Sequence, residues 1–218
     1  MRIPERTIFW DWNGTLLDDA LTCMHTMNHM LERRRMPLLN LELYKEVFSF
    51  PDIEYYKKIG FDFNRESFEQ LSVEFIDAYN RALGSAPLAG GARDVLEYFR
   101  KAGRKNIIVS AMKQEMLERS VHDKEIGDLF TDILGIDNIY AASKSDRALS
   151  YVEKEGLEIS DILFIGDTEH DYEVAEEIGC RCILIADGHQ SEERLRATGT
   201  IVLPSLTALL DTFLTKNI

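Results

Sequence analysis

Residues 7–17 read Thr-Ile-Phe-Trp-Asp-Trp-Asn-Gly-Thr-Leu-Leu. The stretch opens with a short apolar run, carries an aspartate at position 11, and continues into Asn13-Gly14, a pair that favours turns. Apolar residues at successive positions are typical of a strand that is covered on both faces of its sheet. The sequence therefore predicts a buried strand over Thr7–Trp12 that places Asp11 at the beginning of a loop.

Further apolar runs along the chain are similar to the first. They are Asn106–Ser110, a shorter run near Ile133, Ile162–Ile165 and Cys182–Ile185. Segments with apolar residues at every third or fourth position separate these runs, and glycines such as Gly103 and Gly156 end the segments. Strands that alternate with helices predict an α/β fold built on a doubly wound parallel sheet.

Polar side chains stand where the predicted strands end. Asp11, Ser110 and Asp167 each lie at or just past the carboxyl end of a strand. Because ligands of a doubly wound sheet bind beyond the carboxyl ends of its strands, we expect these three residues to line one site.

Residues 18–88 interrupt the alternation of strands and helices. Apolar residues at helical spacing form two stripes, one over Leu21–Leu31 and one over Phe68–Ala82, and no strand-like run separates them. This pattern predicts an all-helical cap, residues 18–88, inserted into a core made of residues 1–17 and 89–218. Gly84, Pro87 and Gly90-Gly91 are candidate hinges between the two.

The composition narrows the classes of partner. The chain has 218 residues, of which 45% are apolar and 29% charged, and its 38 acidic and 25 basic side chains give a net charge of −13. Such a surface repels nucleic acid and anionic lipid, because it offers few cations to neutralise phosphate. An anionic substrate would need a metal ion or a local cation inside the site.

The sequence carries no targeting signal that we recognise. The first residues lack the apolar stretch of a signal peptide, and no run of about eighteen apolar residues is present. We therefore expect a cytoplasmic protein that binds neither membrane nor nucleic acid, while the oligomeric state stays open.

Three carboxylates at one edge of a sheet, Asp11, Asp167 and Asp171, would repel one another. A hard divalent cation relieves that repulsion, and oxygen ligands suit Mg²⁺. Magnesium beside Lys144 would supply the positive field that a phosphate group needs. A carboxylate in that field can attack phosphorus and form an aspartyl-phosphate, and the Ser110 hydroxyl can hold phosphoryl oxygens.

Four motifs carry a resemblance to a known family. They are Asp11-Trp-Asn13-Gly-Thr-Leu after a strand, Ser110 at a strand end, Lys144, and Gly166-Asp167-Thr-Glu-His-Asp171. In order and spacing this sequence resembles the haloacid dehalogenase (HAD) superfamily, with its Rossmannoid core, and most of all its phosphoglycolate-phosphatase-like branch. The helical insertion resembles that family's C1-type cap.

The resemblance implies a magnesium site. Asp11 would be both nucleophile and metal ligand, and Asp167 a second side-chain ligand. The backbone carbonyl of Asn13 would supply a third oxygen, and Asp171 would support the site from the first or second shell.

The resemblance also implies a phosphate site. Ser110, Ala111 and Thr15 would bind the phosphoryl oxygens, and Lys144 would offset the charge of Asp11 and of the transferring group. The expected activity is Mg²⁺-dependent hydrolysis of a small-molecule phosphate monoester through an aspartyl-phosphate.

Asn13 departs from the family pattern. Phosphatases of the family usually carry an aspartate two residues after the nucleophile, where it protonates the leaving oxygen, whereas an amide exchanges no proton at neutral pH. Three readings stay open: a slow enzyme or one that prefers good leaving groups, an enzyme that recruits another acid, or a relative that binds or senses a phosphorylated ligand. We expect Asp11→Asn to abolish turnover and Asn13→Asp to raise it.

Residues of the cap would choose the substrate. Candidates are Ser49-Phe50-Pro51 with Tyr55, Tyr56 and Lys57, although a simple helix junction explains them equally well. A third function, cleavage of a phosphonate, would use a Schiff-base lysine, for which Lys57 or Lys58 is a weak candidate. His170 and His189 lie near the predicted site, and for His170 a structural role is favoured over a proton shuttle.

Overall fold

The computed structural model describes residues 3–136 and 143–214. Its six strands form one parallel sheet with the order β3-β2-β1-β4-β5-β6, which confirms the doubly wound α/β fold. The strands are β1 Thr7–Trp10, β2 Lys105–Lys113, β3 Asp132–Ile136, β4 Ile162–Gly166, β5 Arg181–Ile185 and β6 Ile201–Leu203. The predicted core also includes residues 1–2, 137–142 and 215–218, which lie outside the described ranges.

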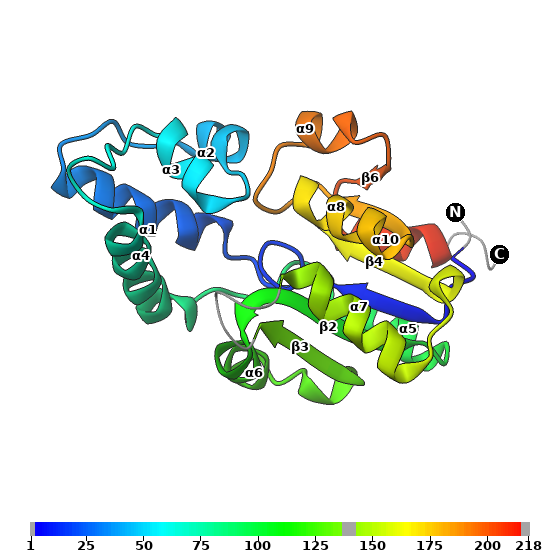
Figure 1. Ribbon diagram of the computed structural model, residues 1–218. Helices are drawn as coiled ribbons and strands as arrows, with labels where there is room; N and C mark the ends of the chain where they lie inside the picture. The colour runs from blue at the N-terminus through cyan, green and yellow to red at the C-terminus, as the bar shows by residue number, and fades with distance from the viewer. Residues whose placement is uncertain (1–2, 137–142, 215–218) are drawn as a thin grey trace.

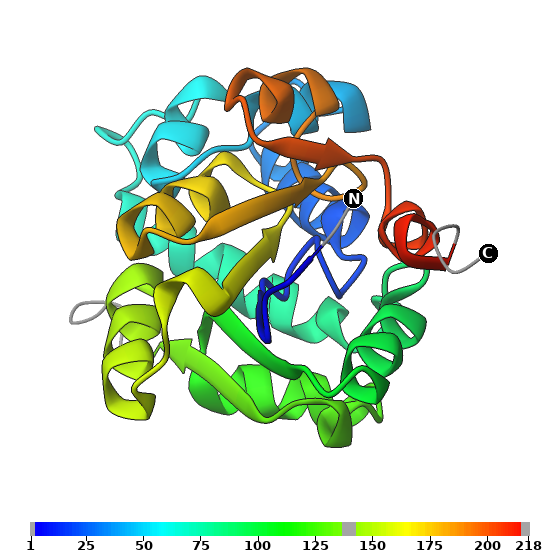
Figure 2. The ribbon, with the colours of Figure 1, turned by 90° about the vertical axis from the view of Figure 1, so that its right-hand side faces the viewer.

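Helices cover both faces of the sheet. Along β1, the buried Ile8 and Trp10 pack with α5, α6 and α10, while the buried Phe9 between them packs with α7, α8 and α9. Figure 2 shows α5 and α10 on one side of the sheet and α7 and α8 on the other. The helices of the core are α5 Ala92–Lys101, α6 Gln114–Asp123, α7 Lys144–Glu155, α8 Glu169–Ile178, α9 Glu192–Ala197 and α10 Leu206–Leu214, with 3-10 turns η1 Gly127–Leu129 and η2 Ile159–Asp161.

Residues between β1 and α5 are helical, as the sequence predicts. They form α1 Ala20–Arg33, α2 Leu41–Val47, α3 Asp52–Lys58 and α4 Phe68–Leu83. Figure 1 shows these helices gathered at one end of the sheet. Met24, Met27 and Met30 fill the interior of this group, whereas Leu21 of the predicted stripe is 48% exposed. The exact bounds of the cap as a domain stay a prediction.

Several strand bounds differ from the predicted ones. β1 ends at Trp10, two residues early, because the chain turns into the loop that carries Asp11. β2 continues to Lys113, so Ser110 lies inside the strand, at the start of a stretch where its register with β3 shifts. The short edge strand β6 was not predicted, since three residues are too few to show a period.

The helices α1–α4 contact the core through a small set of polar groups. The Arg194 guanidinium of α9 donates to the carbonyl oxygens of Lys45 (3.1 Å), Glu46 (3.0 Å) and Phe48 (2.5 Å) at the end of α2. Gln190 Nε2 also donates to the Phe48 carbonyl, at 3.1 Å. These bonds satisfy the carbonyl groups that a helix leaves unpaired at its carboxyl end, and they hold the cap helices over the sheet edge.

Candidate active site

The register of the sheet brings Asp11 and Asp167 to the same edge. Trp10 pairs with Ile165 of β4, and the Asp11 backbone N–H donates to the Ile165 carbonyl at 2.8 Å. Asp11 and Asp167 therefore each follow directly from adjacent parallel strands, in the central position of the six-stranded sheet.

Asp11, Asp167 and Asp171 converge as the sequence predicts. Their carboxylate oxygens lie within 4.8 Å of one another, and all three residues are buried. Burial raises the pKa of Asp11 well above its usual range, and the other two carboxylates raise it further. Burial likewise raises the pKa of Asp167 to about 6. The cluster thus needs positive charge to stay ionised.

Lys144 supplies part of that charge. It is the first residue of α7, and its ammonium group contacts Oδ1 of both Asp11 and Asp171. Burial opposes the charged lysine, but the two carboxylates outweigh burial and raise the pKa of Lys144. In the same way, Lys144 offsets the burial of Asp171 and lowers its pKa. One cation balances one of the three negative charges.

The oxygens of the cluster have different partners. Oδ2 of Asp171 accepts from the backbone N–H groups of Asp167 (3.1 Å) and Thr168 (2.9 Å) and from the Thr168 hydroxyl (2.7 Å). Asp167 accepts from the Thr15 hydroxyl at 2.8 Å and from the His189 backbone N–H at 2.7 Å. Oδ2 of Asp11 accepts no hydrogen bond from any described residue, so it is the oxygen left for a reaction.

Glycine lets the backbone approach Asp167 closely. Gly14 has φ +77°, and a Cβ there would lie 2.2 Å from Asp167 Oδ2 and 2.4 Å from the His189 ring. A Cβ at Gly188 would lie 2.1 Å from the same carboxylate. Any larger residue at either position would displace the carboxylate.

The donors in this cluster fit a magnesium ion. Mg²⁺ prefers oxygen ligands from one or two carboxylates and keeps several waters. Asp11 and Asp167 are such carboxylates, and the Asn13 carbonyl accepts no hydrogen bond from the described residues. With Lys144 included, the cluster carries two uncompensated negative charges, which a divalent cation would balance.

The residues predicted to bind phosphate differ in their burial and in their hydrogen bonds. Ser110 is buried, and its hydroxyl accepts from the Met112 backbone N–H at 3.1 Å, which leaves its own proton to donate. Ala111 is exposed, as a backbone donor beside a ligand can be. Thr15 gives its hydroxyl proton to Asp167 and so orients that carboxylate. Its predicted contact with phosphate stays a prediction.

Asn13 belongs to a network that the sequence did not indicate. Its Nδ2 donates to Asp19 Oδ2 at 2.9 Å and to the Tyr79 hydroxyl oxygen at 2.8 Å. Asp19 is fully buried and also accepts from the Gly14 backbone N–H at 2.8 Å and the Tyr79 hydroxyl at 2.5 Å. Tyr79 comes from α4 of the cap. In the sequence, Asp19 is simply the second of two acidic residues that follow Leu17, a pattern typical of ordinary surface charge.

His189 completes this network. Its Nε2 lies 3.2 Å from Asp19 Oδ1, its Nδ1 lies 2.7 Å from the Tyr44 hydroxyl, and its ring stacks on Phe48 at 4.8 Å. Burial alone would lower the pKa of His189, but the Asp19 carboxylate outweighs burial and raises it to about 9. The histidine is therefore a cation that pairs with Asp19 at neutral pH.

This ion pair predicts a pH-dependent stability. The pKa of His189 rises from 6.5 to about 9 on folding. Its contribution is fully present below pH 6.5 and is lost as the pH rises through 9, a fall of about 3 kcal/mol in the free energy of unfolding. Urea denaturation between pH 6.5 and 9.5 measures it. His189→Gln should remove this pH dependence, while His122→Gln at an exposed position should keep it; an unchanged slope in His189→Gln would contradict the assignment.

A family model described as haloacid dehalogenase-like hydrolase matches residues 8–185. This stretch covers most of the chain and contains Asp11, Lys144 and Asp167. The chain belongs to the haloacid dehalogenase-like hydrolase family. It is therefore an enzyme of a hydrolase family, which agrees with the clustered carboxylates and the buried lysine.

Similar sequences and structures of known proteins support the same family assignment for this HAD-like hydrolase. It is 24% identical over 213 residues to a phosphoglycolate phosphatase of Pseudomonas putida, covering 94% of this chain and 78% of that one. It is 22% identical to phosphoglycolate phosphatase 1 of Pseudomonas aeruginosa, covering 96% and 79% of the two chains. A haloacid dehalogenase-like hydrolase from Streptococcus pneumoniae has a similar solved structure, with TM-score 0.82, 19% identity, and coverage of 97% and 100%.

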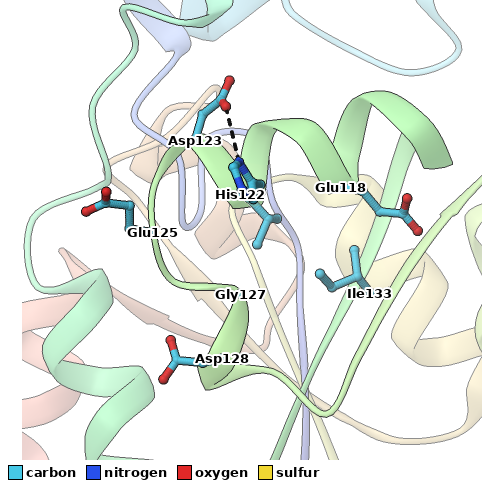
Figure 3. Close-up of a pocket in the computed structure, with 8 residues that line it drawn as sticks. Glu118, His122, Asp123, Glu125, Gly127, Asp128 and Ile133 are labelled. Carbon is cyan, nitrogen blue, oxygen red and sulfur yellow. Dashed lines mark ion pairs between the residues drawn. The ribbon is translucent and has the colours of Figure 1, made fainter.

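One surface hollow of this HAD-like hydrolase lies away from the carboxylate cluster. Residues of α6, η1 and β3 line it, and Figure 3 shows the side chains of Glu118, Glu125 and Asp128 around it. None of its lining residues belongs to the cluster around Asp11. Separately, no helix in the described ranges is long and apolar enough to cross a membrane.

Proposed function

We propose that this hydrolase is a Mg²⁺-dependent phosphatase that cleaves a small-molecule phosphate monoester with Asp11 as nucleophile. The observation that carries the proposal is that no described residue donates to Oδ2 of Asp11, while Lys144 binds Oδ1 in a buried cluster of oxygen ligands. Asp11, Asp167 and the Asn13 carbonyl would hold the magnesium ion, which supplies positive charge next to the phosphoryl group.

The residues of the chain have separate tasks in this reaction. Oδ2 of Asp11 attacks phosphorus, the bond from phosphorus to the ester oxygen breaks, and an aspartyl-phosphate forms. Lys144 binds Oδ1 and so holds the carboxylate in place, while the Ser110 hydroxyl donates to a phosphoryl oxygen. Water then attacks phosphorus, and the bond to Asp11 breaks to restore the carboxylate.

The expected substrate is a small phosphorylated metabolite in the cytoplasm. The two Pseudomonas relatives are named phosphoglycolate phosphatases, so phosphoglycolate belongs in the first panel. The net charge of −13 argues against nucleic acid and membranes as partners.

Magnesium dependence gives the first test. With EDTA, release of inorganic phosphate from a metabolite panel should stop, and added Mg²⁺ should restore it. Asp167→Asn should weaken the Mg²⁺ affinity at least about 10-fold, because even partners of metal ligands typically contribute 10- to 100-fold. Isothermal titration of the metal-free protein measures the affinity. Asp128→Asn, at an exposed surface position, is the matched control. Full activity in EDTA would contradict the proposal.

Two other functions share some of these residues. A protein that only binds a phosphorylated ligand is favoured by Asn13, whose side chain exchanges no proton; it would bind the ligand without releasing phosphate.

Cleavage of a phosphonate would need a cap lysine near the substrate. Lys57 and Lys58 are both exposed; Lys57 pairs with Glu54 at 2.6 Å, and Lys58 donates to the buried Ser49 at 3.1 Å. Borohydride trapping of a substrate on Lys58 would support that reading.

A further inference from the structure

The leaving oxygen of a phosphate ester often needs a proton. An alcohol leaves as a strongly basic alkoxide unless a general acid protonates it, and that help is typically worth about 10²–10⁴ in rate. The hydrogen bonds around Asp11 show which donors are available for this task. They point to a restricted class of substrate.

The side-chain amide of Asn13 has no N–H left to donate to a leaving group. Both of its amide hydrogens are used, one on Asp19 and one on Tyr79. The reverse orientation would set the amide oxygen 2.9 Å from a carboxylate oxygen of Asp19, which is repulsive. Tyr79 gives its own proton to Asp19, so its oxygen needs the donor that Asn13 provides. The remaining Oδ1 of Asn13 accepts no hydrogen bond within the described ranges.

Apart from the Ser110 hydroxyl, whose proton we assign to a phosphoryl oxygen, the other donors described near Asp11 already bind buried partners. Lys144 binds Asp11 and Asp171. His189 directs one ring nitrogen to Asp19 and the other to Tyr44. The hydroxyl protons of Thr15 and Tyr79 go to Asp167 and Asp19. His189, Thr15 and Tyr79 would each have to break a bond to a buried partner before they could protonate a leaving group. Lys144 keeps a third N–H, but loss of a proton would leave Asp11 and Asp171 without their buried cation.

We propose that this site acts on phosphates whose leaving oxygen departs as a stable anion, with acyl phosphates as the substrate class. A carboxyl group has a pKa of about 4 and a phenol about 10, so a carboxylate leaves with the least need for a proton. This proposal rests on the proposed phosphatase function.

The reaction balances without an acid. Oδ2 of Asp11 bonds to phosphorus, and the electron pair of the breaking P–O bond departs with the carboxylate. Water then attacks phosphorus, and the bond between phosphorus and Asp11 breaks. Both protons of the water stay on the released phosphate or pass to solvent.

A series of leaving groups tests the proposal. kcat/KM is measured with Mg²⁺ for acetyl phosphate, aryl phosphates from nitrophenyl to phenyl, and a small alkyl phosphate, with Asp11→Asn as the blank. We expect log(kcat/KM) to fall steeply as the leaving-group pKa rises, with the alkyl phosphate about 10²–10⁴-fold slower than acetyl phosphate. Turnover that is equally fast for alkyl and acyl phosphates would overturn this inference alone. No turnover on any member would overturn the phosphatase function as well.

An exchange of two side chains provides a second arm. Asn13→Asp alone would set two carboxylates 2.9 Å apart, and their repulsion would oppose the expected rise in turnover. The double variant Asn13→Asp/Asp19→Asn avoids this repulsion, because it keeps the net charge of the pair. We therefore test the expected rise in turnover with the double variant. The exchange should raise alkyl phosphate turnover relative to acetyl phosphate at least about 10-fold; an unchanged ratio in a folded variant would contradict the proposal.

A variant of His170 tests whether this residue acts as the acid that protonates the leaving group. It packs on Phe50 at 5.0 Å and lies 3.2 Å from Glu173. His170→Gln should leave the dependence on leaving-group pKa unchanged, and a steeper dependence would identify His170 as the donor and overturn the proposal. If the exchange variant fails to fold, the wild-type series decides alone.

Discussion

We expect Asp11→Asn to abolish phosphate release from every substrate that the wild type hydrolyses. The amide keeps the size of the carboxylate and can still lie beside Lys144, but it has no anionic oxygen to attack phosphorus. Loss of a nucleophile in other covalent hydrolases costs up to about 10⁶ in kcat, and we expect at least about 10⁴ here. Malachite green detection of phosphate with Mg²⁺ present measures the effect.

Asp18→Asn is the control for this variant. Asp18 lies in the same loop and is exposed, whereas Asp11 is buried. The control should retain wild-type turnover. Unchanged turnover in Asp11→Asn, with circular dichroism showing a native fold, would refute Asp11 as the nucleophile.

We expect Lys144→Met to lower both stability and activity. The substitution keeps the unbranched shape of the side chain, one atom shorter, but leaves Asp11 and Asp171 without their buried cation. Removal of one partner from a buried ion pair typically destabilises a protein by about 3–5 kcal/mol. Loss of a cation beside the transferring group should reduce kcat by about 10²–10³. Urea denaturation in EDTA and phosphate release in Mg²⁺ measure the two effects.

Lys154→Met is the control that distinguishes loss of the buried ion pair from a general effect of substitution in helix α7. Lys154 lies on the same helix, α7, and its side chain is 77% exposed. The control should lose less than about 0.5 kcal/mol. Equal stability of Lys144→Met and the wild type would mean that the buried contacts of Lys144 contribute no net free energy.

The sequence was sufficient to predict the carboxylate cluster. Asp11 and Asp167 follow apolar runs, and the parallel arrangement of those runs forces their carboxyl ends to one edge. Lys144 begins a helix on the same edge, so its place was also predictable. Each of these inferences depends on local pattern and on one general rule of sheet topology.

The partners of Asn13 could not be predicted in the same way. Asp19, Tyr79 and His189 come from a helix start, from the cap and from the loop after β5. They meet only because the cap helices lie over the sheet edge, and no periodicity in one segment records that arrangement. The sequence pattern identified the unusual residue at position 13, and the tertiary contacts show what its amide does.

The cover over the sheet edge also bears on the size of the substrate. Tyr44 and Tyr79 of the cap reach the core next to Asp11, which is only 7% exposed. We therefore expect slower release of phosphate from a folded protein or a long polymer than from a small molecule. On this expectation, the dimensions of a molecule limit its access to Asp11 before any chemical recognition begins.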